Sequence, residues 1–528
     1  MEDLQKPAFS GSPDDADALA RLGHKQELTR NFSKLSMLGL AFAILNSWTA
    51  LSTSLNLALT SGGPTAVIWG LMTAGVCNLC LAASLAEFLS AWPTAGGQYH
   101  WAAQVSWPRA SRIISFATGW INVGAWVCLT ASGGLLGSTL IIDIIALMHE
   151  DYVYHAWHQF LIYIAFTLGS FFINAFSSRL LPLFTKAAFL WSVAGFVIIS
   201  ITVLACASPN YQSGEFVYGK FINEVGWPDG FSWLLGLLQG AFALTGFDGV
   251  IHMIEEIPNP TREGPKIMLY SIGIGMFTGW VFLSCILFVI TDVDAVNSNA
   301  AGPLLTAIYQ ATNNKAGSIC LLMFPLICMV FTSVTLMTTS SRMSYAFARD
   351  RGLPFSSFFA QIHPRLHVPV NAMLWTSVWV IIFGCVFLGS TSAFNAIVSA
   401  SVVCLGITYA IPPTIHCLRG RNLLPESRPF KLKGALGWTL NMVGILWTVL
   451  TTVLFFFPPE HPTTADNMNY SIVAFGIILV IAAGQWIVDG HKNYTGPVAD
   501  VDMATYGQAH DEPSDGSSAA AEESKKAE

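Results

Sequence analysis

Long apolar stretches recur along almost the whole chain, and each is long enough to cross the hydrocarbon core of a membrane as a helix. About 20 apolar residues span the roughly 30 Å of that core. The stretches fall at 37–60, 65–91, 112–147, 156–175, 181–206, 231–256, 267–291, 317–347, 369–389, 393–418, 434–457 and 470–488. Because helices satisfy their own backbone hydrogen bonds in lipid, the pattern predicts an all-α polytopic membrane protein of about twelve transmembrane helices.

The composition is that of a chain whose main solvent is lipid. Only 11% of the 528 residues are charged, whereas a soluble domain has about a quarter. The net charge of -7 argues against nucleic acid as a partner, because phosphate backbones are bound by clustered Lys and Arg. The ten Cys are scattered through apolar stretches, and Cys77 and Cys80 have no second pair at metal-site spacing. We therefore expect no metal and no cofactor.

Lys and Arg are distributed unevenly between the connections of the predicted spans. With the N-terminus inside the cell, all 25 of them except Lys220 and Lys315 lie on the cytoplasmic side. Positive charge is retained on that side during insertion, so both termini are expected to be cytoplasmic. We expect an N-terminal tail at 1–30, a membrane domain at 31–490 and a disordered tail at 491–528. With no organellar signal, the plasma membrane is the expected location.

Two predicted spans, the first and the sixth, are interrupted by polar residues at mid-depth. Irregular backbone at this depth is tolerated only where it surrounds a cavity, which makes such breaks candidate substrate sites. The candidates are Asn46, Ser47, Trp48, Thr49, Phe242, Thr245, Gly246, Phe247 and Asp248. The alternative is that the polar side chains of the first span only bond to a neighbouring helix.

Spans one and six would be the first helices of two consecutive units of five helices. Because five is odd, the second unit starts from the opposite side of the membrane, which is the condition for an inverted repeat. We expect repeat one at about 37–206, repeat two at about 231–418 and two extra helices at about 434–488.

Asp248 is the sharpest single candidate, because a carboxylate at membrane depth is costly and is usually retained for function. It could balance a substrate ammonium or carry a proton, and the alternative is that it caps the second half of the broken helix. His252, Glu255 and Glu256 follow with spacing similar to a metal triad. Without further ligand pairs, a gate or proton network that includes them and Glu87 is the better interpretation.

Aromatic residues near the breaks could surround a cation, because aromatic faces attract quaternary ammonium groups. Trp48 and Phe247 have the stronger case, since each lies in a broken segment. For Trp126 and Trp191, which could line the same cavity, plain packing is the favoured interpretation.

Several long motifs resemble the amino acid–polyamine–organocation superfamily, and within it the fungal amino acid/choline transporter group. They are Ser61-Gly62-Gly63-Pro64, AEFLSAWPTAGGQYHW at 86–101, GFDGVIHMIEEIPNP at 246–260 and SRMSYAFARD at 341–350. The resemblance, over about residues 30–490, implies a five-plus-five inverted repeat with two extra helices and a substrate held between the broken spans. It also implies alternating access and carriage of choline, gamma-aminobutyrate or amino acids, commonly driven by protons.

The chain departs from the amino acid carriers of that superfamily at the first break. Many of those carriers have a glycine-rich sequence there, whereas residues 46–49 of this chain are Asn-Ser-Trp-Thr. The added bulk counts against an ordinary alpha-amino acid, and the Trp is compatible with a choline-like head group.

Two other classes compete with this interpretation. A carrier of the major facilitator type should have a basic, glycine-containing loop between spans two and three and a long central loop, and the segments 98–111 and 259–266 fit neither. A membrane-embedded enzyme would need paired catalytic groups, for which only the His252 cluster is a weak candidate. The sequence therefore predicts a secondary active transporter and not an enzyme, with a small amine or amino acid, protons and the lipid bilayer as its partners.

Overall fold

The computed structural model describes residues 30–149, 151–464 and 467–497. The predicted N-terminal tail lies outside the described residues except for Arg30. Most of the predicted C-terminal tail, from residue 498 onward, lies outside them as well.

The described chain is built from helices. Those of the first predicted repeat are α2 (Lys34–Leu45), α3 (Ser47–Thr53), α4 (Leu55–Leu59), α5 (Gly63–Thr65), the π-helix η1 (Ala66–Gly70), α6 (Leu71–Ala91), α7 (Gln98–Val105), α8 (Ser111–Met148), α9 (Ala156–Phe176), η2 (Ser178–Leu180) and α10 (Leu181–Ala207). Next come α11 (Gly214–Gly219), α12 (Asp229–Ala243), α13 (Gly249–His252), η3 (Ile254–Glu256), α14 (Pro260–Val289), α15 (Val293–Ser298), α16 (Pro303–Thr312), α17 (Lys315–Arg349), α18 (Ser356–Phe359), α19 (Val370–Gly389) and α20 (Thr391–Leu418). The last are α21 (Gly434–Leu454), α22 (Ser471–Gln485), η4 (Trp486–Gly490) and α23 (His491–Asn493).

The all-α polytopic class expected from the sequence is confirmed. Within the described ranges, 11 helices are long and apolar enough to cross a membrane. The remaining expected span, the sixth at 231–256, is not one continuous helix. It consists of α12, a non-helical stretch from Leu244 to Asp248, and the short α13. The interruption is the one that its polar and glycine residues predicted.

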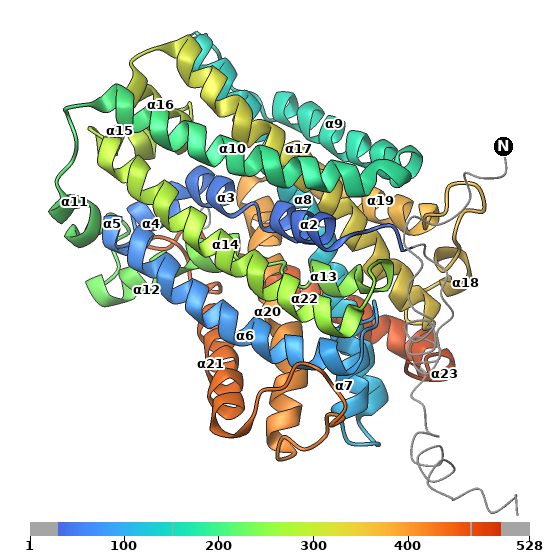
Figure 1. Ribbon diagram of the computed structural model, residues 1–528. Helices are drawn as coiled ribbons and strands as arrows, with labels where there is room; N and C mark the ends of the chain where they lie inside the picture. The colour runs from blue at the N-terminus through green and yellow to red at the C-terminus, as the bar shows by residue number, and fades with distance from the viewer. Residues whose placement is uncertain (1–29, 150, 465–466, 498–528) are drawn as a thin grey trace, which may run out of the picture.

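The broken first span lies inside the helix bundle. Figure 1 shows α2 and α3 between α10 and α14; α10 packs along α2, and α14 packs along both. In addition, α6 packs along α14, α8 along α17 and α9 along α19. Each of these pairs joins a predicted span to the one five places later, which fits two units related by a two-fold axis.

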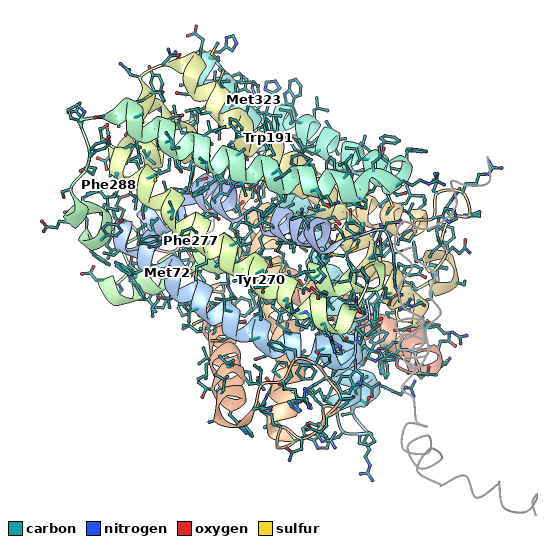
Figure 2. The ribbon with its side chains drawn as sticks, in the orientation of Figure 1. Met72, Trp191, Tyr270, Phe277, Phe288 and Met323 are labelled. Carbon is teal, nitrogen blue, oxygen red and sulfur yellow. The ribbon has the colours of Figure 1, made fainter. Side chains whose placement is uncertain are left out.

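The outer surface of the bundle is apolar, as a lipid-facing surface must be. Figure 2 shows Tyr270 and Phe277 on the outward side of α14, and more than half of each side chain is exposed. Water would make this exposure costly, whereas lipid does not. The bilayer is therefore the natural surrounding of these helices.

Close contact between α2 and α10 depends on one glycine. A Cβ added at Gly39 would lie 2.3 Å from the backbone oxygen of Thr185, and backbone cannot rotate away. At Gly169, on α9, no atom lies within 4 Å of the added Cβ.

We therefore expect Gly39→Ala to destabilise the fold by about 1–3 kcal/mol, the usual effect of overpacking a helix contact. The melting temperature of the detergent-purified protein measures this. Gly169→Ala is the matched control and should melt at or above the wild-type temperature; equal melting of both variants would contradict the tight contact.

Candidate functional site

The break in the first span is made by one residue in the left-handed conformation. Asn46 joins α2 to α3 with φ 41° and ψ 41°, a region that Asn adopts more readily than most residues. Its Nδ2 lies 3.6 Å from the sulfur of Met329 on α17. Because α3 starts afresh at Ser47, the N–H groups of its first turn have no partner within the helix.

The break in the sixth span turns at Gly246, where φ is 96°. A Cβ there would lie 3.1 Å from Ile44 on α2, and one at Gly249 would lie 2.4 Å from the same side chain. The two broken spans therefore contact each other directly, and glycine at both positions permits the approach.

A small cavity of about 30 Å³ lies where the two breaks meet. It holds roughly two waters, since one water occupies about 10–15 Å³ by the same measure. Its lining is Ile44, Leu45, Asn46, Ala50, Leu129, Ser132, Gly133, Leu136, Phe242, Ala243, Thr245, Met329, Thr332 and Leu336. Three of the candidates taken from the sequence, Asn46, Phe242 and Thr245, thus line one space.

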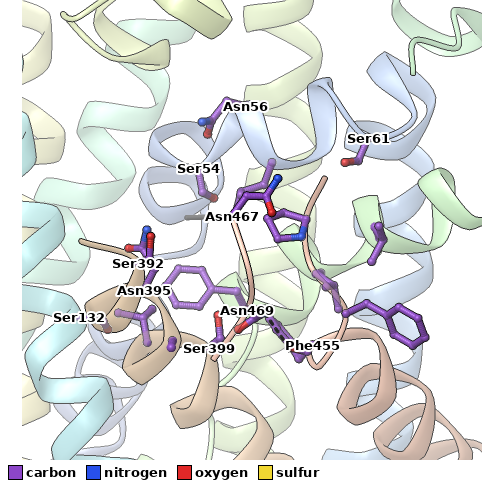
Figure 3. A pocket seen from close by; sticks show the side chains of 18 of the residues that line it. Ser54, Asn56, Ser61, Ser132, Ser392, Asn395, Ser399, Phe455, Asn467 and Asn469 are labelled. Atoms are coloured by element: carbon purple, nitrogen blue, oxygen red, sulfur yellow. Dashed lines mark hydrogen bonds between the residues drawn. The ribbon is translucent and has the colours of Figure 1, made fainter. Parts of the chain in front are cut away.

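A larger vestibule of about 380 Å³ opens beyond this cavity, and Figure 3 shows its polar lining. Ser132, Leu136 and Phe242 line both spaces and form the floor between them. The labelled side chains are hydroxyl and amide groups such as Ser54, Asn395 and Asn469, with Phe455 beside them. None of the described residues that line the vestibule is ionisable.

Asp248 does not line the cavity; it is fully buried behind the break. Its Oδ2 accepts hydrogen bonds from Gln98 Nε2 at 2.8 Å and Trp126 Nε1 at 3.1 Å, and lies 3.2 Å from His252 Nε2. Its Oδ1 accepts from the Tyr409 hydroxyl. The Asp248 side chain makes no capping hydrogen bond to α13, so the capping interpretation does not describe its contacts.

A second layer of polar contacts surrounds this carboxylate. Asn122 Nδ2 donates to Gln98 Oε1 at 3.0 Å, and His252 Nδ1 lies 2.8 Å from the carbonyl oxygen of Ala95. The N–H of Ala95 in turn donates to Glu255 Oε1 at 3.0 Å. One residue of the turn after α6 therefore connects the Asp248 site to the next acidic group.

Ion pairs close the end of the bundle that carries the connections 92–110, 350–369 and 419–433, which we call the basic end. Arg349 binds both oxygens of Glu255 at 3.0 and 3.1 Å. Arg342 Nε donates to Glu256 at 3.1 Å. Both carboxylates are thus held by guanidinium groups, in place of the metal geometry that their spacing suggested.

Glu87 is held by the 419–433 connection. It accepts from Arg428 Nη2 at 2.8 Å, from the N–H of Leu432 at 2.9 Å and from Arg421. This bonding ties α6 to the end of α20 at the basic end.

Tyr99 adds a further link at the basic end, because its hydroxyl donates to Asp350 at 2.7 Å. Burial, and then the nearby Asp350 carboxylate, raise the pKa of Tyr99 well above its ordinary value. Tyr99 therefore remains a neutral donor at every physiological pH.

The remaining aromatic candidates lie apart from the cavity lining. Trp48 packs on Phe282 and donates to Ser192 at 2.8 Å. Trp191 stacks on Phe324 between α10 and α17. Phe247 packs on Tyr409 with ring centres 4.7 Å apart.

Two of the polar candidates in the first break, Ser47 and Thr49, are not among the residues that line the cavity. Ser47 Oγ faces Gly275 of α14, where an added Cβ would lie 2.2 Å from it. The carbonyl oxygen of Thr49 accepts from Ser52 and Thr53 within the same helix.

Several residues of the site were not among the candidates from the sequence. Gln98, Asn122 and Tyr409 bond to or around Asp248, and Ser132 and Thr332 line the cavity. Gln98 lies inside a motif quoted for the family resemblance, and Tyr409 is a polar-tipped residue in an apolar run. These two features of the sequence could have identified Gln98 and Tyr409 as site residues.

Comparison with known proteins places the chain beside membrane permeases. A family model described as amino acid permease matches residues 35–481. The choline transporter of Saccharomyces cerevisiae is 32% identical over 91% of this chain and 85% of its own length. The amino-acid permease BAT1 of Arabidopsis thaliana is 31% identical over 92% of this chain and 96% of its own. The swainsonine transporter swnT of Arthroderma benhamiae is 29% identical over 88% and 91%.

The buried ion pair at the basic end predicts a large stability effect. Arg349→Gln removes the guanidinium that binds both oxygens of the buried Glu255, and breaking a buried ion pair costs about 3–5 kcal/mol. We expect a lower melting temperature, partly restored in Glu255→Gln/Arg349→Gln, where the carboxylate that lost the Arg349 guanidinium is removed as well.

The exposed pair of Glu426 and Lys431, 3.1 Å apart, is the control. Solvent screens that pair, so Glu426→Gln should melt like the wild type. Equal destabilisation by Glu426→Gln and Arg349→Gln would contradict a special role for the buried pair.

Proposed function

Since the chain belongs to the amino acid permease family and is an integral membrane transporter of the amino acid and organocation class, we propose that it moves a small amine-bearing solute by alternating access. The observation that carries the proposal is the cavity between the two broken spans. The cavity shares three lining residues with the open vestibule, whereas the ion pairs of the basic end lie outside its lining, further along α17. The structure then corresponds to a closed or outward-facing stage of the cycle.

The lining favours a small polar solute with an amino or ammonium group. The half-buried ring of Phe242 borders the cavity, and an aromatic face attracts a cation. Choline, gamma-aminobutyrate and amino acids all carry an ammonium group that this attraction would favour.

Relatives carry names that fit this range, among them a choline transporter and an amino-acid permease. These names support the class of substrate and leave choline, gamma-aminobutyrate and amino acids as the compounds to compare.

Accumulation against a gradient needs a coupled ion, and we assign that role to protons. A proton carrier must be a titratable group in the membrane that can exchange its proton during the cycle. Asp248 and His252 are such groups, lying within one turn of the second break.

The orientation proposed from the charges places the basic end and both termini in the cytoplasm, in the plasma membrane. The vestibule then faces outward, since Asn56 and Asn469 lie at the opposite end of the helices from the basic connections. We keep the repeat boundaries at about 37–206 and 231–418, with the extra helices at about 434–488. Both breaks then occupy the first helix of a repeat.

Transport assays test the proposal directly. Cells that lack their own carriers should accumulate labelled choline, gamma-aminobutyrate or one of the amino acids when they express this chain, and accumulation should increase at acidic external pH. Correctly localised protein that accumulates none of these compounds would overturn the proposed substrate class. Accumulation without any dependence on the proton gradient would overturn proton coupling.

Phe242 offers a sharper test of substrate recognition. Cation–π attraction contributes about 0.5–2 kcal/mol, so Phe242→Ala should raise the KM for an ammonium substrate by about 2- to 30-fold. Phe242→Tyr retains an aromatic face and should retain most of the affinity. Phe457 lines only the vestibule, so Phe457→Ala is the control; if it raised KM as much, the site would lie further out.

A further inference from the structure

We infer that Asp248 and His252 share one proton and together form the proton-binding site of this transporter. The inference deepens the proposed proton-coupled transport and rests on it. Neither group lines the cavity, so the site for the proton is separate from the site for the solute.

The hydrogen bonds around His252 determine how many protons the pair holds. The Ala95 carbonyl oxygen can only accept, so His252 Nδ1 carries a hydrogen. Nε2 faces Oδ2 of Asp248 at 3.2 Å, and two lone pairs would repel at this distance. One further proton therefore lies between Nε2 and Oδ2, either as imidazolium beside carboxylate or as neutral imidazole beside carboxylic acid.

Neutral donors complete the surroundings of this proton. Gln98 from α7, Trp126 from α8 and Tyr409 from α20 all donate to the Asp248 carboxylate. They stabilise its charge without supplying a fixed cation. The carboxylate can therefore remain when the proton leaves, and it can take the proton back.

Ion pairs hold charged side chains on the other elements packed against α13. On α17, Arg342 binds Glu256 and Arg349 binds Glu255. On α14, Glu263 binds Lys34 of α2 at 2.9 Å and Lys266 at 3.5 Å. Arginine does not release its proton in proteins, so the carboxylates that it holds are poor proton carriers.

Departure of the proton has a structural consequence. If the proton on Nε2 passes to water, Asp248 is left as a carboxylate facing the lone pair of a neutral His252, and the two must separate. Movement of His252 disturbs its bond to Ala95, whose N–H holds Glu255 of the Glu255–Arg349 pair. Release of the proton is thus linked by short contacts to the ion pair that closes the basic end.

The experiment compares two transport modes of the full-length protein in liposomes. Exchange of labelled for unlabelled solute at equal pH needs only solute binding and alternating access, whereas accumulation driven by a proton gradient also needs proton binding. Asp248→Asn, which cannot ionise, should retain exchange within about 3-fold, roughly 0.7 kcal/mol. Its gradient-driven accumulation of solute should fall at least about tenfold, which corresponds to 1.4 kcal/mol of coupling free energy.

A buried carboxylate elsewhere in the membrane provides the control. Asp143 lies 17 residues from Trp126 on α8, about 25 Å along the helix, so Asp143→Asn should retain both modes. If Asp248→Asn does not fold, His252→Gln is measured in its place. It should likewise retain exchange and lose gradient-driven accumulation. In the wild type, a pH-sensitive dye should report one proton moved per solute.

The inference is overturned if Asp248→Asn still accumulates solute with the gradient, or if Asp143→Asn loses accumulation while Asp248→Asn does not. Loss of exchange in folded Asp248→Asn would also overturn it, because Asp248 would then serve solute binding. Wild-type protein that exchanges no solute would instead contradict the proposed function, so the two failures are distinguishable.

Discussion

The structure depends on one requirement of the bilayer, that no backbone polar group may face lipid without a partner. A continuous helix meets this requirement by its own internal hydrogen bonds, but the broken spans α2/α3 and α12/α13 do not. Both breaks are consequently enclosed: Asn46 is covered by Met329 of α17, and Gly246 lies against Ile44 and Leu129. The long helices around the breaks shield the irregular backbone from lipid, and the space left between the breaks is the cavity.

Four of the buried carboxylates differ in the kind of partner that they bind. Glu87, Glu255 and Glu256 each bind arginine, which fixes their charge and joins helix ends at one side of the membrane. Asp248 instead binds neutral donors and a histidine, the side chain whose charge changes most readily near neutral pH. The same carboxylate chemistry thus closes the bundle in one place and, in our proposal, exchanges a proton in another.

Most of the fold could be predicted from hydrophobic run length, and the two breaks from the polar residues within those runs. The sequence could not show which face of a long buried helix meets which neighbour. Trp48 lies in a break yet packs on Phe282, whereas Trp126, for which packing was favoured, bonds to Asp248. Gln98 and Tyr409 reach that carboxylate from distant segments, a contact that only tertiary packing creates.

Ala95 joins the proposed proton site to the closing ion pair through its own carbonyl oxygen and N–H. Both contacts belong to the main chain, so the methyl side chain contributes nothing to the connection. Ala95 is buried, so a larger side chain would have to displace its neighbours, and proline, which lacks the N–H, would remove the bond to Glu255 directly. A link made of backbone thus does not depend on the chemistry of the side chain at this position, and it is interrupted by changes that move or remove the backbone groups themselves.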